Sequence, residues 1–245
     1  MYKIRDQLSN LGIASKDVVL MHSSMKSLET ELTPKDFLFE LMDTLTDSGT
    51  LLLPALTYES VTLEHPFFSV CDSEPCVGIL PKTFLKMKGV HRSMHPTHSV
   101  CAWGANAEAL TCEHIRDNTP VGPCSPFMLL PKFDGKILFV GDVLHSCTFM
   151  HGIEELVNAP YTMNKDMTRY TLTDAQGKTI DKEYYTHNFK GWNQEYPRIR
   201  DILEFPDIRT GLICAAPCTV IDPNKLKAAA IERFQEDIYA FVSPA

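Results

Sequence analysis

The segment CTFMHGIEE, residues 147–155, places a histidine and a carboxylate where they can share a proton. His151 and Glu154 are three residues apart, so on a helix they lie on one face, where the carboxylate can orient the imidazole or stabilise its charged form. Thr148, one turn earlier, adds a hydroxyl to that face. The spacing indicates a general base with its orienting group, although an ordinary exposed His–Glu helix pair has the same pattern.

Cys147 offers a different chemistry in the same segment. It stands four residues before His151, and a thiol near a helix N-terminus and a histidine can be activated as a thiolate nucleophile. Free cysteine is also a common small core residue, which is the favoured interpretation here. A thiol nucleophile therefore stays the main rival mechanism.

The stretch HSSMKS, residues 22–27, follows a predicted buried strand and has the composition of an anion-binding turn. Backbone N–H groups, the hydroxyls of Ser23 and Ser24, and the ammonium group of Lys26 can together hold a phosphate. Serine-rich turns are also common loops, and this one lacks the glycines of a P-loop or a dinucleotide fingerprint.

Three histidines gather in HRSMHPTHSVCAWG, residues 91–104. A metal site would need His91, His95 and His98 to converge, but Pro96 prevents a helix from aligning them and no nearby carboxylate completes the set. We therefore predict no metal here.

The same stretch also carries groups that suit an anion. Arg92 with Ser93 and Ser99 can bind one, and His95 or His98 can form hydrogen bonds inside a cleft. The alternative is a loop whose histidines satisfy buried backbone groups. One sequence leaves both interpretations open.

The elements around these segments predict an α/β fold. Residues 17–21 and 50–53 are apolar strands, and between them Thr33-Pro34 begins a helix with a buried face through Leu45, so a parallel βαβ unit with a right-handed crossover is expected. Further helices are predicted over 79–88, 105–114, 148–157 and 222–241. Further strands are predicted over 99–103, 135–141 and 212–221, with a hairpin over 168–185 around DAQG.

Length and composition predict one globular enzyme. The 245 residues are 44% hydrophobic, so a single domain over 1–245 is expected, with 160–205 as a small subdomain or insertion. A net charge of -8 disfavours nucleic acid as a partner and suits a cationic substrate. No stretch resembles a signal peptide or a membrane span, and eight cysteines lack any CxxC pair, so we expect a cytoplasmic protein without a membrane partner.

Six motifs in this order resemble the aminoglycoside 3-N-acetyltransferase family, which acetylates amines using acetyl-CoA: HSSMKSL, LLLPALTY, RSMHPTHSVCAWG, TPVGPCSPF, GKILFVG and TFMHGIEE. The RSxHPxxSxxAxG pattern is the most specific of them. The resemblance implies a three-layer α/β/α sandwich, distinct from the GNAT acetyltransferases, with a largely parallel or mixed central sheet and CoA in a cleft. It also implies that Thr148, His151 and Glu154 form the catalytic segment.

The motifs and the anion-binding patterns together predict the remaining site residues, with acetyl-CoA as co-substrate and no metal. The predicted acetyl-CoA contacts are His22, Ser23, Ser24, Met25, Lys26, Ser27, Arg92, Ser93, His95 and Ser99. The predicted contacts to the small-molecule amine acceptor are Tyr58, Glu59, Asp142, His145 and Glu155.

Two departures from the family pattern concern the acceptor pocket and the first turn. Many members carry an aspartate where this chain has His145, and a glycine often stands where this chain has Glu29. The expected reaction is direct acetyl transfer to the 3-amino group of a 2-deoxystreptamine antibiotic. The alternatives are a non-antibiotic amine, an acyl-enzyme at Cys147, a metal-dependent hydrolase and a non-enzymatic CoA-binding module, and a homodimer is one open oligomeric state.

Overall fold

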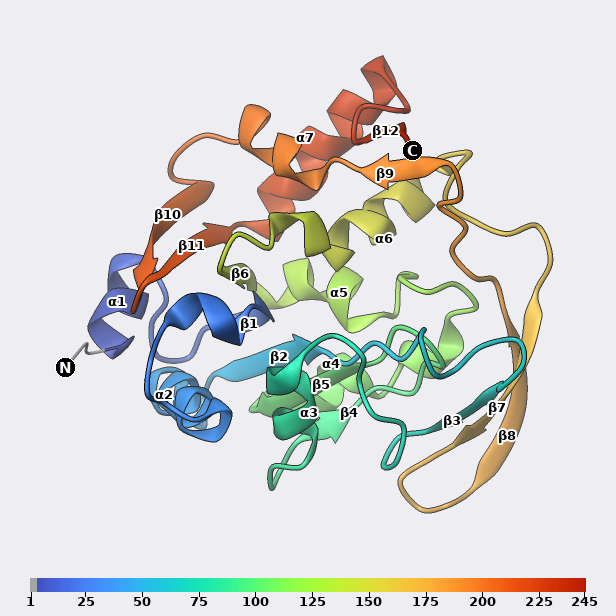
Figure 1. The fold of residues 1–245 in the computed structure, drawn as a ribbon, viewed down its shortest axis with the longest axis horizontal. Helices are drawn as coiled ribbons and strands as arrows, with labels where there is room; N and C mark the ends of the chain where they lie inside the picture. Colours follow the sequence, from blue (N-terminus) through green and yellow to red (C-terminus); the bar gives the residue numbers. More distant parts are fainter. Residues whose placement is uncertain (1–3) are drawn as a thin grey trace.

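The computed structural model describes residues 4–245 and places a seven-stranded mixed sheet at the centre of the molecule (Figure 1). The strand order is β10-β11-β6-β1-β2-β5-β4. The bounds are β1 (Val18–Ser23), β2 (Thr50–Pro54), β4 (His91–Arg92), β5 (Val100–Gly104), β6 (Lys136–Val140), β10 (Ile208–Ile213) and β11 (Ala216–Ile221).

The middle of the sheet is parallel and its edges are antiparallel. Leu20 of β1 is in register with Leu52 of β2 on one side and Ile137 of β6 on the other, and both pairings are parallel. α2 (Pro34–Leu45) connects β1 to β2, and its start is fixed by a capping box in which Thr33 and Asp36 exchange side-chain and backbone hydrogen bonds. The predicted βαβ unit is confirmed.

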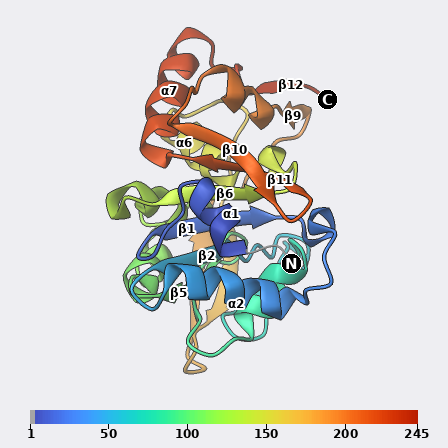
Figure 2. The same ribbon diagram turned by 90° about the vertical axis from the view of Figure 1, so that its left-hand side faces the viewer.

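Helices cover both faces of the sheet. On one face α1 (Ile4–Asn10), α2 and α3 (Ile79–Leu85) share a hydrophobic core with residues such as Val19 and Met21, and α1 and α2 lie in the foreground of Figure 2. On the other face Val18 and Leu20 share a core with α4 (Ala107–Thr111), α5 (Pro126–Leu129), α6 (Thr148–Leu156) and α7 (Pro223–Glu236). Successive side chains of β1 thus point to opposite faces of the sheet, and helices cover both faces. The result is the predicted three-layer arrangement of helices, sheet and helices.

Two small sheets lie beside the main one. β3 (Phe67–Ser69), β7 (Thr168–Thr173) and β8 (Thr179–Tyr184) form the first, at the right-hand edge of Figure 1, and β9 (Trp192–Gln194) pairs with β12 (Val242–Pro244) in the second. Residues 160–205 therefore pair with strands from both earlier and later parts of the chain. Short 3₁₀ helices complete the elements: η1 (Met25–Leu28), η2 (His114–Arg116), η3 (Leu130–Phe133), η4 (Leu144–Ser146) and η5 (Tyr196–Asp201).

Some predicted bounds were wrong. The single strand expected over 212–221 contains the turn of a hairpin: it covers the end of β10, the turn at Cys214 and Ala215, and β11, and Cys214 adopts a φ of 52°. The uninterrupted apolar sequence at this turn lacks the Gly, Asn or Asp that usually signals one. α7 ends at Glu236 rather than near 241, and α3 and α4 are shorter than expected. Within residues 4–245, no helix combines the length and apolar character needed to cross a membrane.

Candidate functional site

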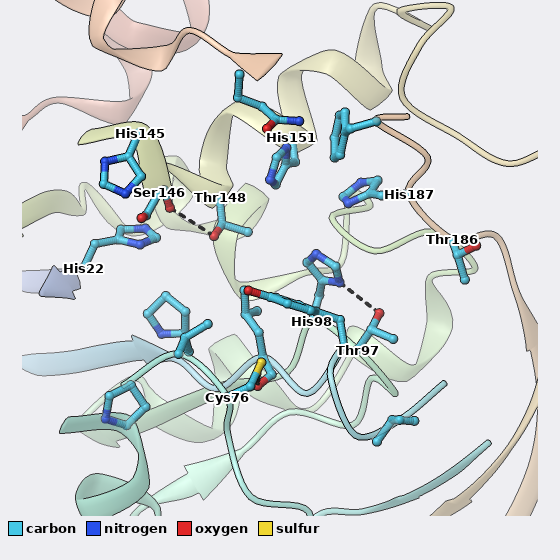
Figure 3. Close-up of a pocket in the computed structure, with 18 of the residues that line it drawn as sticks. His22, Cys76, Thr97, His98, His145, Ser146, Thr148, His151, Thr186 and His187 are labelled. Carbon is cyan, nitrogen blue, oxygen red and sulfur yellow. Dashed lines mark hydrogen bonds between the residues drawn. The ribbon is translucent and has the colours of Figure 1, made fainter. Parts of the chain in front are cut away.

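A pocket of about 810 Å³ lies where the central parallel strands end (Figure 3). His22 and Ser23 end β1, Pro54 ends β2, and residues 143–148 follow β6. Open α/β sheets commonly bind ligands at the carboxyl ends of their strands, and this volume suits a small molecule. Figure 3 shows His98, His151 and His187 grouped on one side, and His22, His145 and Ser146 on the other.

His151 is held by a buried carboxylate and a tyrosine. Its Nδ1 lies 3.1 Å from Glu154 Oε2, and Glu154 is completely buried. Tyr196 donates its hydroxyl proton to Glu154 Oε2 at 2.7 Å, and Tyr161 donates to Oε1 at 3.2 Å. Burial and the neighbouring Glu154 raise the pKa of both tyrosines, so they stay protonated donors. A carboxylate can only accept, so Nδ1 of His151 carries the proton and Nε2 is left basic.

Thr148 and His22 line the pocket near this histidine (Figure 3). The Thr148 hydroxyl donates weakly to the carbonyl oxygen of Ser146 at 3.4 Å. His22 stacks on Phe139 with ring centroids 5.1 Å apart, and burial lowers its pKa to about 3. His22 is therefore a neutral imidazole at neutral pH.

A second histidine–carboxylate pair adjoins the first. His187 Nε2 lies 2.8 Å from Glu155 Oε1, which also accepts the backbone N–H of Val121 at 2.8 Å. The ring centroids of His187 and His151 are 4.9 Å apart, and Phe189 packs against both. Burial raises the pKa of Glu155 to about 7 and lowers that of His187 well below its ordinary value. His187 is thus held mainly neutral.

The HSSMKS turn enters the pocket only at its start. His22 and Ser23 line the pocket, whereas Ser24 and Ser27 pack against Gly141, whose added Cβ would meet Ser27 Oγ at 2.7 Å. Ser24 and Ser27 therefore lie outside the lining of this pocket. Met25 and Lys26 lie on η1 outside the lining, and Lys26 is exposed. Glu29, which follows η1, adopts a left-handed φ of 45°.

The structure corrects the predicted anion-binding role of Arg92. Its Nε donates to Ser99 Oγ at 2.9 Å, and its Nη atoms donate to the carbonyl oxygens of Ala55, Val70 and Ser73 at 3.0, 3.2 and 2.6 Å. Ser99 in turn donates to Ala55 O at 2.8 Å. Both side chains are buried and outside the pocket lining. Their polar groups join a loop to the sheet instead of facing a ligand.

Ser93 and His95 are also structural rather than pocket-lining. Ser93 Oγ accepts the backbone N–H of Val100 at 2.8 Å, and both side chains are completely buried. His95 Nδ1 accepts the backbone N–H groups of Thr97 and His98, at 3.2 and 2.9 Å. The alternative of a loop whose histidines satisfy backbone groups is therefore the correct one for His95. His98 does line the pocket.

The predicted acceptor contacts divide into two groups. Tyr58 and His145 line the pocket. Glu59 is exposed outside the lining, Asp142 faces solvent and pairs with Arg200 at 3.3 Å, and Glu155 lies behind His187. None of these three carboxylates is part of the pocket lining. The prediction that they form an acidic surface for a cationic acceptor is therefore wrong for this pocket.

Sequence reasoning missed several site residues. His187, Phe189 and Tyr196 belong to a segment with short strands and no regular apolar period, so no local signal singled them out. Cys76 also lines the pocket and was missed because it lies in an irregular loop. Within residues 4–245, no three His, Cys, Asp or Glu side chains are arranged to hold a metal ion.

Comparison with known proteins gives consistent matches. A family model described as aminoglycoside 3-N-acetyltransferase matches residues 20–235. Among curated relatives, aminoglycoside N(3)-acetyltransferase VII of Streptomyces paromomycinus is 28% identical over 71% of this chain and 66% of its own length. Aminoglycoside N(3)-acetyltransferase IV of a Salmonella species is 30% identical over 73% of this chain and 66% of its own length. The chain thus spans just under two thirds of these relatives.

Solved structures share the fold over nearly the whole chain. An AAC(3)-IVa mutant in complex with a gentamicin has a TM-score of 0.84 and 24% identity, covering 99% of this chain and 90% of that one. AAC-IIIb with CoASH has a TM-score of 0.80 and 24% identity, covering 99% and 97%. The YokD protein of Bacillus subtilis has a TM-score of 0.81 and 21% identity, covering 96% and 98%.

Proposed function

Because the chain belongs to the aminoglycoside 3-N-acetyltransferase family, we propose that it transfers the acetyl group of acetyl-CoA to an amine, with His151 as general base. The arrangement of His151, Glu154 and Tyr196 supports this most directly, since it leaves a basic imidazole nitrogen on a ring that lines the pocket. Relatives are named for aminoglycosides, and one solved structure holds a gentamicin. Aminoglycosides, at the 3-amino group, are therefore the first acceptors to test.

The proposed reaction is a direct transfer in a ternary complex. The amine nitrogen attacks the thioester carbonyl, His151 Nε2 takes a proton from that nitrogen, and collapse of the intermediate breaks the C–S bond. The thiolate of CoA then takes up a proton. Glu154 stabilises the imidazolium form of His151 through the bond to Nδ1. The Thr148 hydroxyl lines the same pocket and is a donor for the oxyanion.

The experiment that tests this function measures release of CoA thiol from acetyl-CoA with a thiol reagent. Gentamicin, tobramycin and simple amines serve as acceptors, and a blank without acceptor corrects for the eight cysteines of the protein. Turnover that depends on both substrates supports the proposal. Absence of turnover, together with no effect of acetyl-CoA on the melting temperature, would show that the proposed function is wrong.

Replacing Cys147 tests the rival acyl-enzyme mechanism. Cys147 is completely buried, and burial raises its pKa to about 12, so a thiolate is scarce at neutral pH. We expect Cys147→Ala to keep kcat within about twofold of wild type, because the thiol has no role in direct transfer. Intact mass after incubation with acetyl-CoA alone should show no acetyl adduct. A stable adduct that disappears in Cys147→Ala would establish the thiol route instead.

Replacing Lys26 tests the contribution of the exposed turn to acetyl-CoA binding. Its ammonium lies on η1, directly after the pocket-lining His22 and Ser23, where it can attract the phosphates of CoA. We expect Lys26→Ala to raise the KM for acetyl-CoA about threefold at low salt and less at high salt, as for an exposed ion pair. Lys178→Ala, in the exposed turn between β7 and β8, is the matched control. Equal KM values in the two variants would place the phosphates elsewhere.

A further inference from the structure

The pair formed by His187 and Glu155 duplicates, in the same pocket, the pair formed by His151 and Glu154. Each histidine uses one ring nitrogen to contact a buried or nearly buried carboxylate, at 2.8 Å for His187 and 3.1 Å for His151. The two rings are 4.9 Å apart and both line the pocket. The proposed mechanism uses only one of these pairs.

The hydrogen bonds of Glu155 decide which nitrogen of His187 is available. When Glu155 is ionised its Oε1 can only accept, so Nε2 of His187 must carry the proton and Nδ1 must be an acceptor. Within residues 4–245, Nδ1 has no hydrogen-bond partner. The groups facing Glu155 are His187, the side chain of Thr119, the backbone N–H of Val121 and, further away, Asp117 and His151. His187 therefore presents an unused acceptor on a ring that lines the pocket.

The backbone around His187 fixes this acceptor in place. His187 forms a bridge with Met163, and Asn164 Nδ2 donates to the His187 carbonyl oxygen and the Thr186 hydroxyl. Phe189 packs against the ring with centroids 5.0 Å apart. An imidazole held on several sides loses little entropy when it binds a ligand.

We propose that His187, held by Glu155, is a second residue that contacts the acceptor amine, and this inference rests on the proposed acetyl transfer. A primary amine that attacks a carbonyl becomes an ammonium-like nitrogen with two N–H bonds. His151 Nε2 removes the proton of one N–H bond, and His187 Nδ1 accepts a hydrogen bond from the remaining N–H group. The two imidazoles thereby orient the nitrogen lone pair toward the thioester.

The same arrangement defines the class of acceptor. Glu154 and Glu155, the two carboxylates behind the histidine side of the pocket, are each already hydrogen-bonded to a lining histidine. The rest of that lining is hydroxyl, aromatic and aliphatic, including Thr186, Phe189, Val61 and Leu56. A buried ammonium group without a carboxylate partner is costly. The nitrogen that is acetylated is therefore a primary amine that lies between the two histidines in its uncharged form.

Two substitutions of His187 separate contact with the acceptor from a structural role. His187→Gln keeps a polar group near the position of Nε2, toward Glu155, and removes the acceptor at Nδ1. His187→Asn keeps a polar group near Nδ1 and removes the bond to Glu155. At pH 8, where Glu155 is ionised, we expect His187→Gln to lower kcat/KM for benzylamine about tenfold, the effect of one hydrogen bond, and His187→Asn to lose less. The KM for acetyl-CoA should be unchanged in both.

The reverse order, or equal losses in the two variants, would overturn the proposal, because the bond to Glu155 would then be the only function of the ring. Urea unfolding of both variants corrects for any loss of folded protein.

Acceptors with one or two N–H bonds test the same contact in the wild-type protein. N-Methylbenzylamine retains no N–H for His187 after His151 has removed its proton, so it should have a lower kcat/KM than benzylamine. That preference should shrink in His187→Gln, and a preference unchanged by the substitution would overturn the proposal. Binding of acetyl-CoA without turnover of any amine would refute the inference while retaining the cofactor assignment, whereas no binding would refute the proposed function itself.

Discussion

Replacing His151 with alanine should lower kcat by about 10²–10⁴-fold, the usual contribution of a positioned general base. Most amines are protonated near neutral pH and attack a thioester only after losing a proton. In this pocket the imidazole of His151 has its Nδ1 bound to Glu154 and Tyr196, which leaves Nε2 to accept that proton. The measurement is steady-state release of CoA thiol with saturating acetyl-CoA and the best acceptor of the panel.

The substitution should leave acetyl-CoA binding nearly unchanged, so that the loss appears in kcat. Isothermal titration with acetyl-CoA checks this expectation. His91→Ala is a matched control, because His91 is exposed on β4 and does not line the pocket. Near-wild-type turnover in His151→Ala would remove His151 as the base and direct attention to His187.

Replacing Arg92 with methionine should lower the free energy of unfolding by about 3–5 kcal/mol, as expected when one partner of a buried charged network is removed. The guanidinium donates to the carbonyl oxygens of Ala55, Val70 and Ser73, and a methionine would leave them without these donors. Urea denaturation followed by fluorescence measures the change. The interpretation of Arg92 as a phosphate contact predicts the opposite, a raised KM for acetyl-CoA with unchanged stability.

Arg233→Met provides the control for the loss of an arginine. Arg233 is half exposed on α7 and pairs with Glu236 at 2.8 Å, a surface pair whose removal should cost less than about 1 kcal/mol. A similar loss in both variants would show that burial of the Arg92 network contributes little.

The sequence predicted the elements that present the site better than it predicted the site itself. The period of apolar residues and the Thr33-Pro34 start identified the central βαβ unit, and the spacing of His151 and Glu154 placed both on one helical face. These are local signals that a few neighbouring residues determine. The structure contains these elements at the predicted positions, because each depends mainly on its own neighbouring residues.

The missed residues depend on contacts between distant segments. Tyr196 reaches Glu154 from 42 positions away, and His187 reaches Glu155 from 32. Arg92 likewise looked like an anion-binding residue because its sequence neighbours are serines, while its actual partners come from residues 55, 70 and 73. Neither set of contacts leaves a periodic or spacing signal in the chain.

The pairing of β9 with β12 bears on the order in which the molecule is completed during synthesis. The residue before Tyr196, Glu195, donates its backbone N–H to Phe241 O at 2.8 Å, and its carboxylate accepts the Ser243 hydroxyl at 2.6 Å. A ribosome makes β1 and α6 long before it reaches residue 243. A growing chain can thus form the His22 end of the pocket early, whereas the segment that carries Tyr196 gains its partner strand only after residues 242–244 have been made, so the hydrogen bonds that hold His151 are completed late.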